Sequence, residues 1–102
     1  MHLGIYRFDG DPDELLTAYE RLMETIPPGN VGVHLCAVRP DGITLFDTCP
    51  SQAVFERFTS DPALQQAFTA AGLPRPAIDD LPVYVARGPG GTVLGGSRDA
   101  GG

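Results

Sequence analysis

The dipeptide Asp41-Gly42, set between two strand-like runs, constrains the fold of this chain more than any other feature of its sequence. Residues 31–38 and 43–49 are rich in β-branched and aromatic side chains, and Asp-Gly between two such runs is a strong hairpin signal. We therefore expect two antiparallel strands that are neighbours in one sheet.

Helical patterns lie on both sides of this hairpin. Residues 11–26 begin with an aspartate at the N-cap and a proline at the first helical position, and apolar residues then recur on one face. Residues 51–72 begin with Ser51, which is expected to cap a second helix, and this helix is expected to bend or restart at Asp61-Pro62. A strand pair between two helices is typical of the α+β class.

The outer segments complete the fold prediction. Residues 2–9 predict a first strand and residues 81–87 a last strand, which follows a proline-rich connection over 73–82. The resulting β-α-β-β-α-β order is ferredoxin-like and places both helices on one face of an antiparallel sheet. The other face of the sheet would be exposed to water in a single chain. Two such sheets facing each other would bury it and form a dimeric α+β barrel. We therefore expect a homodimer.

Length and glycine content define the domain limits. A chain of 102 residues, of which 42% are hydrophobic, has the size of one domain, and we assign residues 1–87 to it. Residues 88–102 contain too many glycines and too little apolar surface to offset their ordering entropy. They are predicted to form a flexible C-terminal tail.

Charge and cysteine content exclude several classes of partner. The net charge of −6 repels phosphate backbones, so we expect no nucleic-acid partner. Apolar runs are far shorter than the roughly 20 residues of a membrane span, and the start of the chain does not resemble a signal peptide. We expect a cytoplasmic protein with no membrane partner. Cys36 and Cys49 are then predicted to be free thiols.

The hairpin predicts a polar cluster. A two-residue loop formed by the Asp-Gly dipeptide would pair His34 with Cys49 and Cys36 with Asp47, so that all four side chains share one face. We expect this face to look into the barrel. The opposite, more apolar face is expected to pack under the helices and consists of Val33, Leu35, Ala37, Thr44, Phe46 and Thr48.

His34 and Asp47 are the candidate catalytic residues. As diagonal neighbours they could share a hydrogen bond that raises the basicity of the imidazole, which is what a general base needs. The alternatives are a polar pair that only satisfies its own hydrogen bonds, or one that only fixes the hairpin register.

Further side chains could contact a ligand. Tyrosine hydroxyls could bind a carbonyl or a phenol, and phenylalanines could line an apolar pocket, although core packing explains the same residues. A cysteine beside His34 could also act as a nucleophile. The cysteine and histidine spacing matches no zinc motif, so we predict no metal site. The candidate ligand-binding residues are Tyr6, Cys36, Cys49, Phe55, Phe58 and Tyr84, with Tyr19 as a further hydroxyl.

The central segment resembles the antibiotic-biosynthesis-monooxygenase-like proteins of the dimeric α+β barrel superfamily, in particular a small uncharacterised branch. That pattern has a histidine on the second strand, a glycine-containing turn, Asp-x-Trp on the third strand, and a serine-capped helix with a phenylalanine pair. The resemblance covers about residues 2–87 and rests on His34, Gly42, Asp47, Ser51, Phe55 and Phe58.

The resemblance implies a small-molecule-binding barrel without a cofactor. The quinone-forming monooxygenases of the superfamily use Trp, Asn and Tyr side chains, and this chain has no Trp and carries Cys49 where many relatives carry one. Two functions therefore stay open. One is a monooxygenase-like or cyclase-like enzyme acting on an apolar or aromatic oxygen-bearing metabolite, and the other is a non-catalytic protein that binds a metabolite or a partner.

Overall fold

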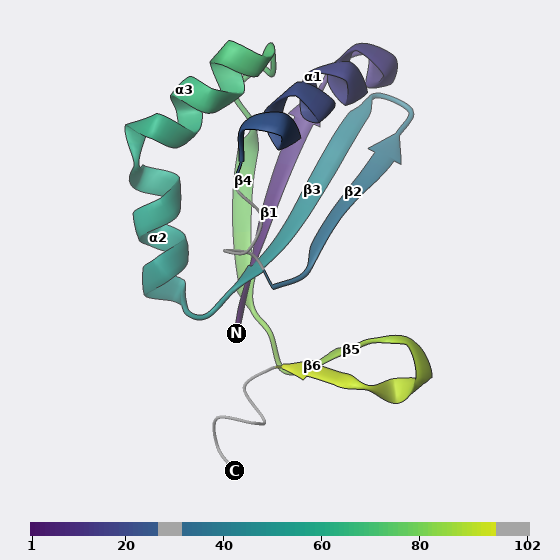
Figure 1. Cartoon of the computed structure of the whole chain (residues 1–102), viewed down its shortest axis with the longest axis vertical. Helices are drawn as coiled ribbons and strands as arrows, with labels where there is room; N and C mark the ends of the chain where they lie inside the picture. Colours follow the sequence, from purple (N-terminus) through teal and green to yellow (C-terminus); the bar gives the residue numbers. More distant parts are fainter. Residues whose placement is uncertain (27–31, 96–102) are drawn as a thin grey trace.

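The computed structural model describes residues 1–26 and 32–95 and contains a four-stranded antiparallel sheet covered by helices on one face (Figure 1). The strand order β2-β3-β1-β4 confirms the predicted ferredoxin-like α+β fold. The sheet strands are β1 (His2–Asp9), β2 (His34–Arg39), β3 (Gly42–Cys49) and β4 (Ala77–Pro82). The helices are α1 (Pro12–Thr25), α2 (Gln52–Ser60) and α3 (Pro62–Ala71).

Side-chain caps explain where the second helical segment starts and breaks. The Ser51 hydroxyl accepts a hydrogen bond of 3.2 Å from the backbone N–H of Val54, at the start of α2. Asp61 ends α2, and its carboxylate accepts a 3.0 Å bond from the N–H of Ala63 at the start of α3. The predicted cap and the predicted restart of the helix are both confirmed. The aspartate at position 11 precedes α1 as expected but makes no side-chain cap bond.

The core lies between the sheet and the helices. Phe8 and Ile43 are fully buried, and Phe8 meets Phe68 of α3 edge to face, with ring centroids 5.3 Å apart. Burial of such a side chain contributes roughly 1.5–3 kcal/mol. The other buried apolar residues are Tyr6, Leu15, Ala18, Leu22, Leu45, Phe55, Ala71 and Leu73.

The predicted hairpin register was wrong by two residues. The loop consists of Pro40 and Asp41, so Gly42 belongs to β3 and pairs with Arg39. The physical reason is the approach of β1, because a Cβ on Gly42 would lie 2.1 Å from the carbonyl oxygen of Phe8. Glycine is needed there for strand packing rather than for the turn. In consequence His34 pairs with Asp47.

The assignment of the two sheet faces was also wrong. His34, Cys36, Asp47 and Cys49 point toward the helices, because they lie on the same face of the hairpin as the buried core residues Ile43 and Leu45. Among residues 1–26 and 32–95, no helix covers the opposite face (Figure 1). The side chains on this open face include Leu3, Ile5, Leu35, Phe46 and Leu81.

The last strand of the sheet lies earlier than predicted. Residues 77–82 form β4 and pair with β1, whereas residues 81–87 had been expected to do so. The sequence pattern did not indicate a strand here because β4 contains two adjacent aspartates, and aspartate is rare in strands. Residues 83–85 leave the sheet, and residues 86–95 form a separate hairpin of β5 (Ala86–Arg87) and β6 (Val93–Gly95) around the short helix η1 (Pro89–Gly91).

Part of the predicted tail therefore belongs to this hairpin, and residues 96–102 lie outside the described part of the chain. The domain boundary at residue 87 stays a prediction. In the ranges that the structure describes, no helix combines the length and apolar character needed to cross a membrane.

Candidate functional site

One polar row crosses the whole sheet on the side of the helices. His34 on β2 lies opposite Asp47 on β3, Asp47 lies opposite Gly4 on β1, and Gly4 lies opposite Asp80 on β4. Cross-strand neighbours on one face have Cβ atoms roughly 5 Å apart, so adjacent members of this row can interact. The row places the candidate pair His34 and Asp47 in direct register.

His34 and Asp47 form a hydrogen bond between Nδ1 of the ring and Oδ1 of the carboxylate. Their side chains are 28% and 22% exposed, so the pair is neither sealed in the core nor immersed in bulk water. The structure thus brings the two candidate catalytic residues together on one face. Their catalytic roles stay predictions.

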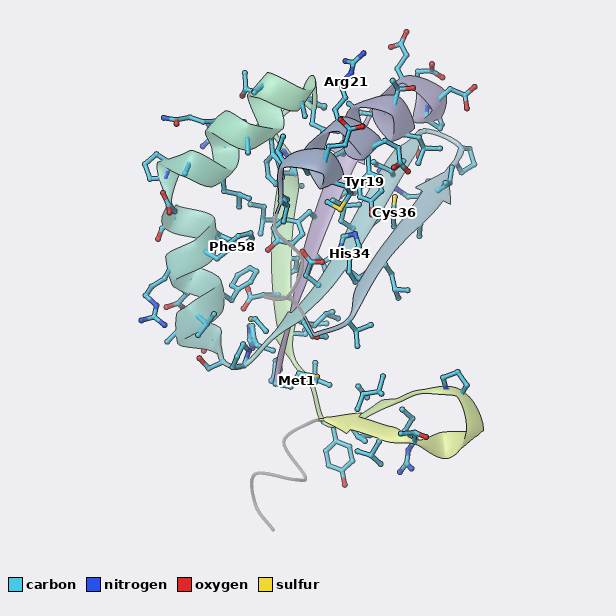
Figure 2. The ribbon with its side chains drawn as sticks, in the orientation of Figure 1. Met1, Tyr19, Arg21, His34, Cys36 and Phe58 are labelled. Atoms are coloured by element: carbon cyan, nitrogen blue, oxygen red, sulfur yellow. The ribbon has the colours of Figure 1, made fainter. Side chains whose placement is uncertain are left out.

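Tyr19 is a third member of the hydrogen-bonded group formed by His34 and Asp47, and this contact was not predicted from the sequence. Its hydroxyl lies 2.6 Å from Nε2 of His34, and the two ring planes are parallel to within 1°. Figure 2 shows Tyr19 reaching from α1 toward His34 on β2. The sequence locates Tyr19 on the apolar face of a helix, but its contact with β2 depends on how α1 lies across the sheet.

The hydrogen bonds of the Asp47–His34–Tyr19 chain fix the roles of its atoms. An ionised carboxylate can only accept, so Nδ1 of His34 carries the proton that bonds to Asp47. In a neutral imidazole Nε2 then has a free lone pair and accepts the hydrogen bond from the Tyr19 hydroxyl. Burial raises the pKa of the Tyr19 hydroxyl, and the nearby charges of Glu20 and Asp47 raise it further. Tyr19 is therefore a neutral phenol that donates to His34.

Tyr6 lies beside this chain and is only 2% exposed. Its hydroxyl approaches Gly4, where a Cβ would lie 3.0 Å from the oxygen and 2.8 Å from the ring of Phe55. Burial raises the pKa of Tyr6 well above its usual range, and the charges of Asp47 and Cys49 add to the effect. The missing side chain at Gly4 thus makes room for Tyr6 and Phe55 next to Asp47.

The two cysteines are half-buried free thiols on the same face. Burial raises the pKa of Cys36, and the charge of Glu20 raises it further, so the unreactive thiol is favoured over the thiolate. Cys49 donates a weak 3.4 Å hydrogen bond to the carbonyl of Ser51. The raised pKa of Cys36 disfavours the thiolate that a nucleophilic role would need.

Two of the candidate ligand-binding residues are less enclosed. Phe58 on α2 is 45% exposed. Tyr84 is 70% exposed. It was predicted to lie on the last strand of the sheet, but it lies in the link between β4 and β5. Across residues 1–26 and 32–95, no three histidine, cysteine or acidic side chains gather closely enough to hold a metal ion.

A second histidine–aspartate pair lies at the other end of the polar row. Nε2 of His2 is 2.5 Å from Oδ2 of Asp80, and the His2 ring contacts Phe55 with centroids 5.6 Å apart. His2 is almost fully buried, and no tyrosine hydroxyl is bonded to it in the described residues. It provides an internal comparison for His34.

Comparisons with known proteins identify the fold. No family model and no curated protein matches the sequence. A candidate antibiotic biosynthesis monooxygenase from Deinococcus radiodurans matches the structure with a TM-score of 0.61 and 11% identity, over 86% of this chain and 97% of that chain. Another from Chloroflexus aurantiacus J-10-fl matches with a TM-score of 0.53 and 17% identity, over 89% of this chain and 97% of that chain. This protein therefore has the fold of the antibiotic-biosynthesis-monooxygenase-like proteins.

Proposed function

We propose that this protein binds a small, apolar, oxygen-bearing metabolite between the sheet and the helices and removes a proton from it without a cofactor. The observation that carries the proposal is the Asp47–His34–Tyr19 chain, which is half-buried and ends in a phenol hydroxyl. The buried rings of Tyr6 and Phe55 supply apolar surface beside it. Both structural relatives carry a monooxygenase description, which agrees with this class of ligand.

The proton leaves through Tyr19, because both ring nitrogens of His34 already have partners. The Tyr19 oxygen takes the proton of the ligand while the original Tyr19 proton moves to Nε2 of His34. The imidazolium formed in this step is stabilised by the carboxylate of Asp47. The enolate or phenolate that results is electron-rich and can start either an oxygenation or a cyclisation.

Deuterium exchange tests the proton transfer without knowledge of the natural substrate. β-Tetralone is an apolar ketone with acidic C–H bonds next to its carbonyl, and NMR in D₂O follows their exchange. We expect the protein to accelerate exchange and the His34→Gln variant to lose about 10²–10⁴-fold of that acceleration. The His2→Gln variant is the matched control, since it also removes a histidine bonded to an aspartate. Equal exchange in the His34→Gln variant and the native protein would refute the role of His34.

A non-catalytic binding protein is the second candidate. Both ring nitrogens of His34 already have hydrogen-bond partners, which favours this candidate. In addition, no buried side-chain nitrogen or oxygen within the described residues lacks a hydrogen-bond partner. Mass spectrometry of the molecules that co-purify with the protein separates the two candidates. A ligand that is recovered chemically unchanged after prolonged incubation, with no β-tetralone exchange, identifies a binding protein.

We further propose that the protein is a cytoplasmic homodimer that packs its open sheet faces together. Leu35 is 58% exposed on this face. Val38 on the same strand is 59% exposed but lies on the face of the helices, so it provides a matched control. Sedimentation should give twice the chain mass of 10.8 kDa for the native protein and for Val38→Glu, and a single chain mass for Leu35→Glu. A monomeric native protein would rule the dimer out.

A further inference from the structure

We infer that Tyr19 is a redox-active tyrosine, which gives one electron to an organic radical such as the aryloxyl radical of a phenolic ligand while its proton passes to Nε2 of His34. The inference goes beyond the proposed function, because it concerns electron transfer and does not require that the protein deprotonates a ligand. It rests on the hydrogen bond between the Tyr19 hydroxyl and His34 and on the position of Asp47 behind the ring.

A phenol is hard to oxidise unless its proton leaves together with the electron, because the oxidised phenol is a very strong acid. A base that is already hydrogen-bonded to the hydroxyl removes this obstacle. Nε2 of His34 lies 2.6 Å from the Tyr19 oxygen, at the short end of the range for hydrogen bonds. The proton therefore needs to move only along an existing bond.

The step balances within the residues of the site and the oxidant. The O–H bond of Tyr19 breaks, an N–H bond forms at Nε2 of His34, and the aryloxyl radical becomes a phenolate by accepting the electron. Tyr19 is left as a neutral radical and His34 as an imidazolium. Asp47 stabilises that imidazolium through its bond to Nδ1, so the positive charge is compensated where it arises.

The surroundings of Tyr19 fit this role. Burial keeps the hydroxyl protonated by raising its pKa, so that oxidation must include the proton transfer. The ring is only partly buried and packs against the edge of the core, which leaves access for an oxidant. The adjacent Cys36 retains its proton because its pKa is raised as well.

The other tyrosines of the chain lack this arrangement. Tyr6 is almost fully buried, and Tyr84 is largely exposed to water. Within the described residues, which include all three tyrosines, only Tyr19 is hydrogen-bonded to a histidine. The chain has no tryptophan to compete as an electron donor.

Photochemical oxidation tests the inference with the intact protein. A flash-excited ruthenium polypyridyl complex with persulfate supplies a one-electron oxidant, and transient absorption and electron paramagnetic resonance detect tyrosyl radical. We expect radical formation in the native protein and in Tyr84→Phe to be at least about tenfold faster than in Tyr19→Phe. His34→Gln keeps the phenol but removes the base, so its rate should fall by a similar factor at neutral pH.

Two further results decide the outcome. The native rate should show a solvent deuterium isotope effect, and the His2→Gln variant should keep the native rate. Equal rates in the native protein and His34→Gln would overturn the inference, and this comparison holds even if Tyr19→Phe does not fold. The radical can form although β-tetralone exchange fails, and exchange can succeed although the radical does not form, so the two proposals fail separately.

Discussion

His34 and Asp47 lie directly opposite each other across β2 and β3, and the carboxylate bonds to Nδ1 of the ring. This bond decides which nitrogen of His34 carries the proton. It leaves the lone pair of Nε2 directed to α1, where the Tyr19 hydroxyl donates to it. Asp47 on β3 thus determines that His34 on β2 accepts a hydrogen bond from Tyr19 on α1.

Replacement of Asp47 by Asn should disturb this tautomer, because an amide can donate to Nδ1 as well as accept from it. We expect the β-tetralone exchange rate to fall by roughly 10²-fold, since the imidazolium loses its charged partner. Nitrogen NMR of the two histidines should show the change at His34 only. Asp80→Asn should change the spectrum of His2 instead, and an unchanged exchange rate in Asp47→Asn would contradict the proton pathway.

Gly4→Ala should destabilise the protein by about 1–3 kcal/mol. The added Cβ would lie 2.8 Å from the ring of Phe55, which is too close and cannot be relieved by a flexible chain end. Urea unfolding measures the change, and Phe55→Leu in the same chain should recover part of it. Gly88→Ala is the control, because its Cβ would meet only Leu94 at 3.4 Å.

Gly42→Ala should cost more than Gly4→Ala, on the order of 3 kcal/mol or above. Here the added Cβ would lie 2.1 Å from the backbone oxygen of Phe8, so two strands must separate. Amide hydrogen exchange should report weaker protection along β1 and β3. A loss of stability below about 1 kcal/mol would show that β1 does not approach β3 so closely at this point.

Tyr6 should make the protein sensitive to alkali. Its folded-state pKa is raised, so the unfolded chain releases this proton first, and the stabilisation is complete below pH 10 and lost as pH rises above it. The free energy of unfolding should fall by up to about 1.4 kcal/mol per pH unit for this group. Tyr6→Phe should flatten the decline in urea titrations, whereas Tyr84→Phe should follow the native curve.

Local signals in the sequence were sufficient for much of the fold. The cap at Ser51 and the restart at Asp61-Pro62 could be predicted because the hydrogen-bond partners of Ser51 and Asp61 lie within three residues, and both hydrogen bonds are present. The strand order followed from the hairpin and the two helices. His34 and Asp47 were placed on one face because the register error was two residues, which leaves the side-chain alternation unchanged.

Features that depend on tertiary packing could not be predicted in the same way. Gly42 looks like a turn residue, and only the close approach of Phe8 explains its place in a strand. The contact between Tyr19 and His34 depends on the angle at which α1 crosses the sheet. The bounds of β4 were predicted wrongly because its two aspartates disfavour a strand locally, while its pairing partner β1 lies at least 70 residues earlier in the chain.

β4 has a consequence for how copies of this chain can meet. It forms one edge of the sheet and carries Asp79, Asp80 and the terminal Pro82. Two such strands brought edge to edge would place four carboxylates close together, and the proline offers no N–H for a new ladder. Fibre growth by strand addition is therefore opposed at this edge of the sheet.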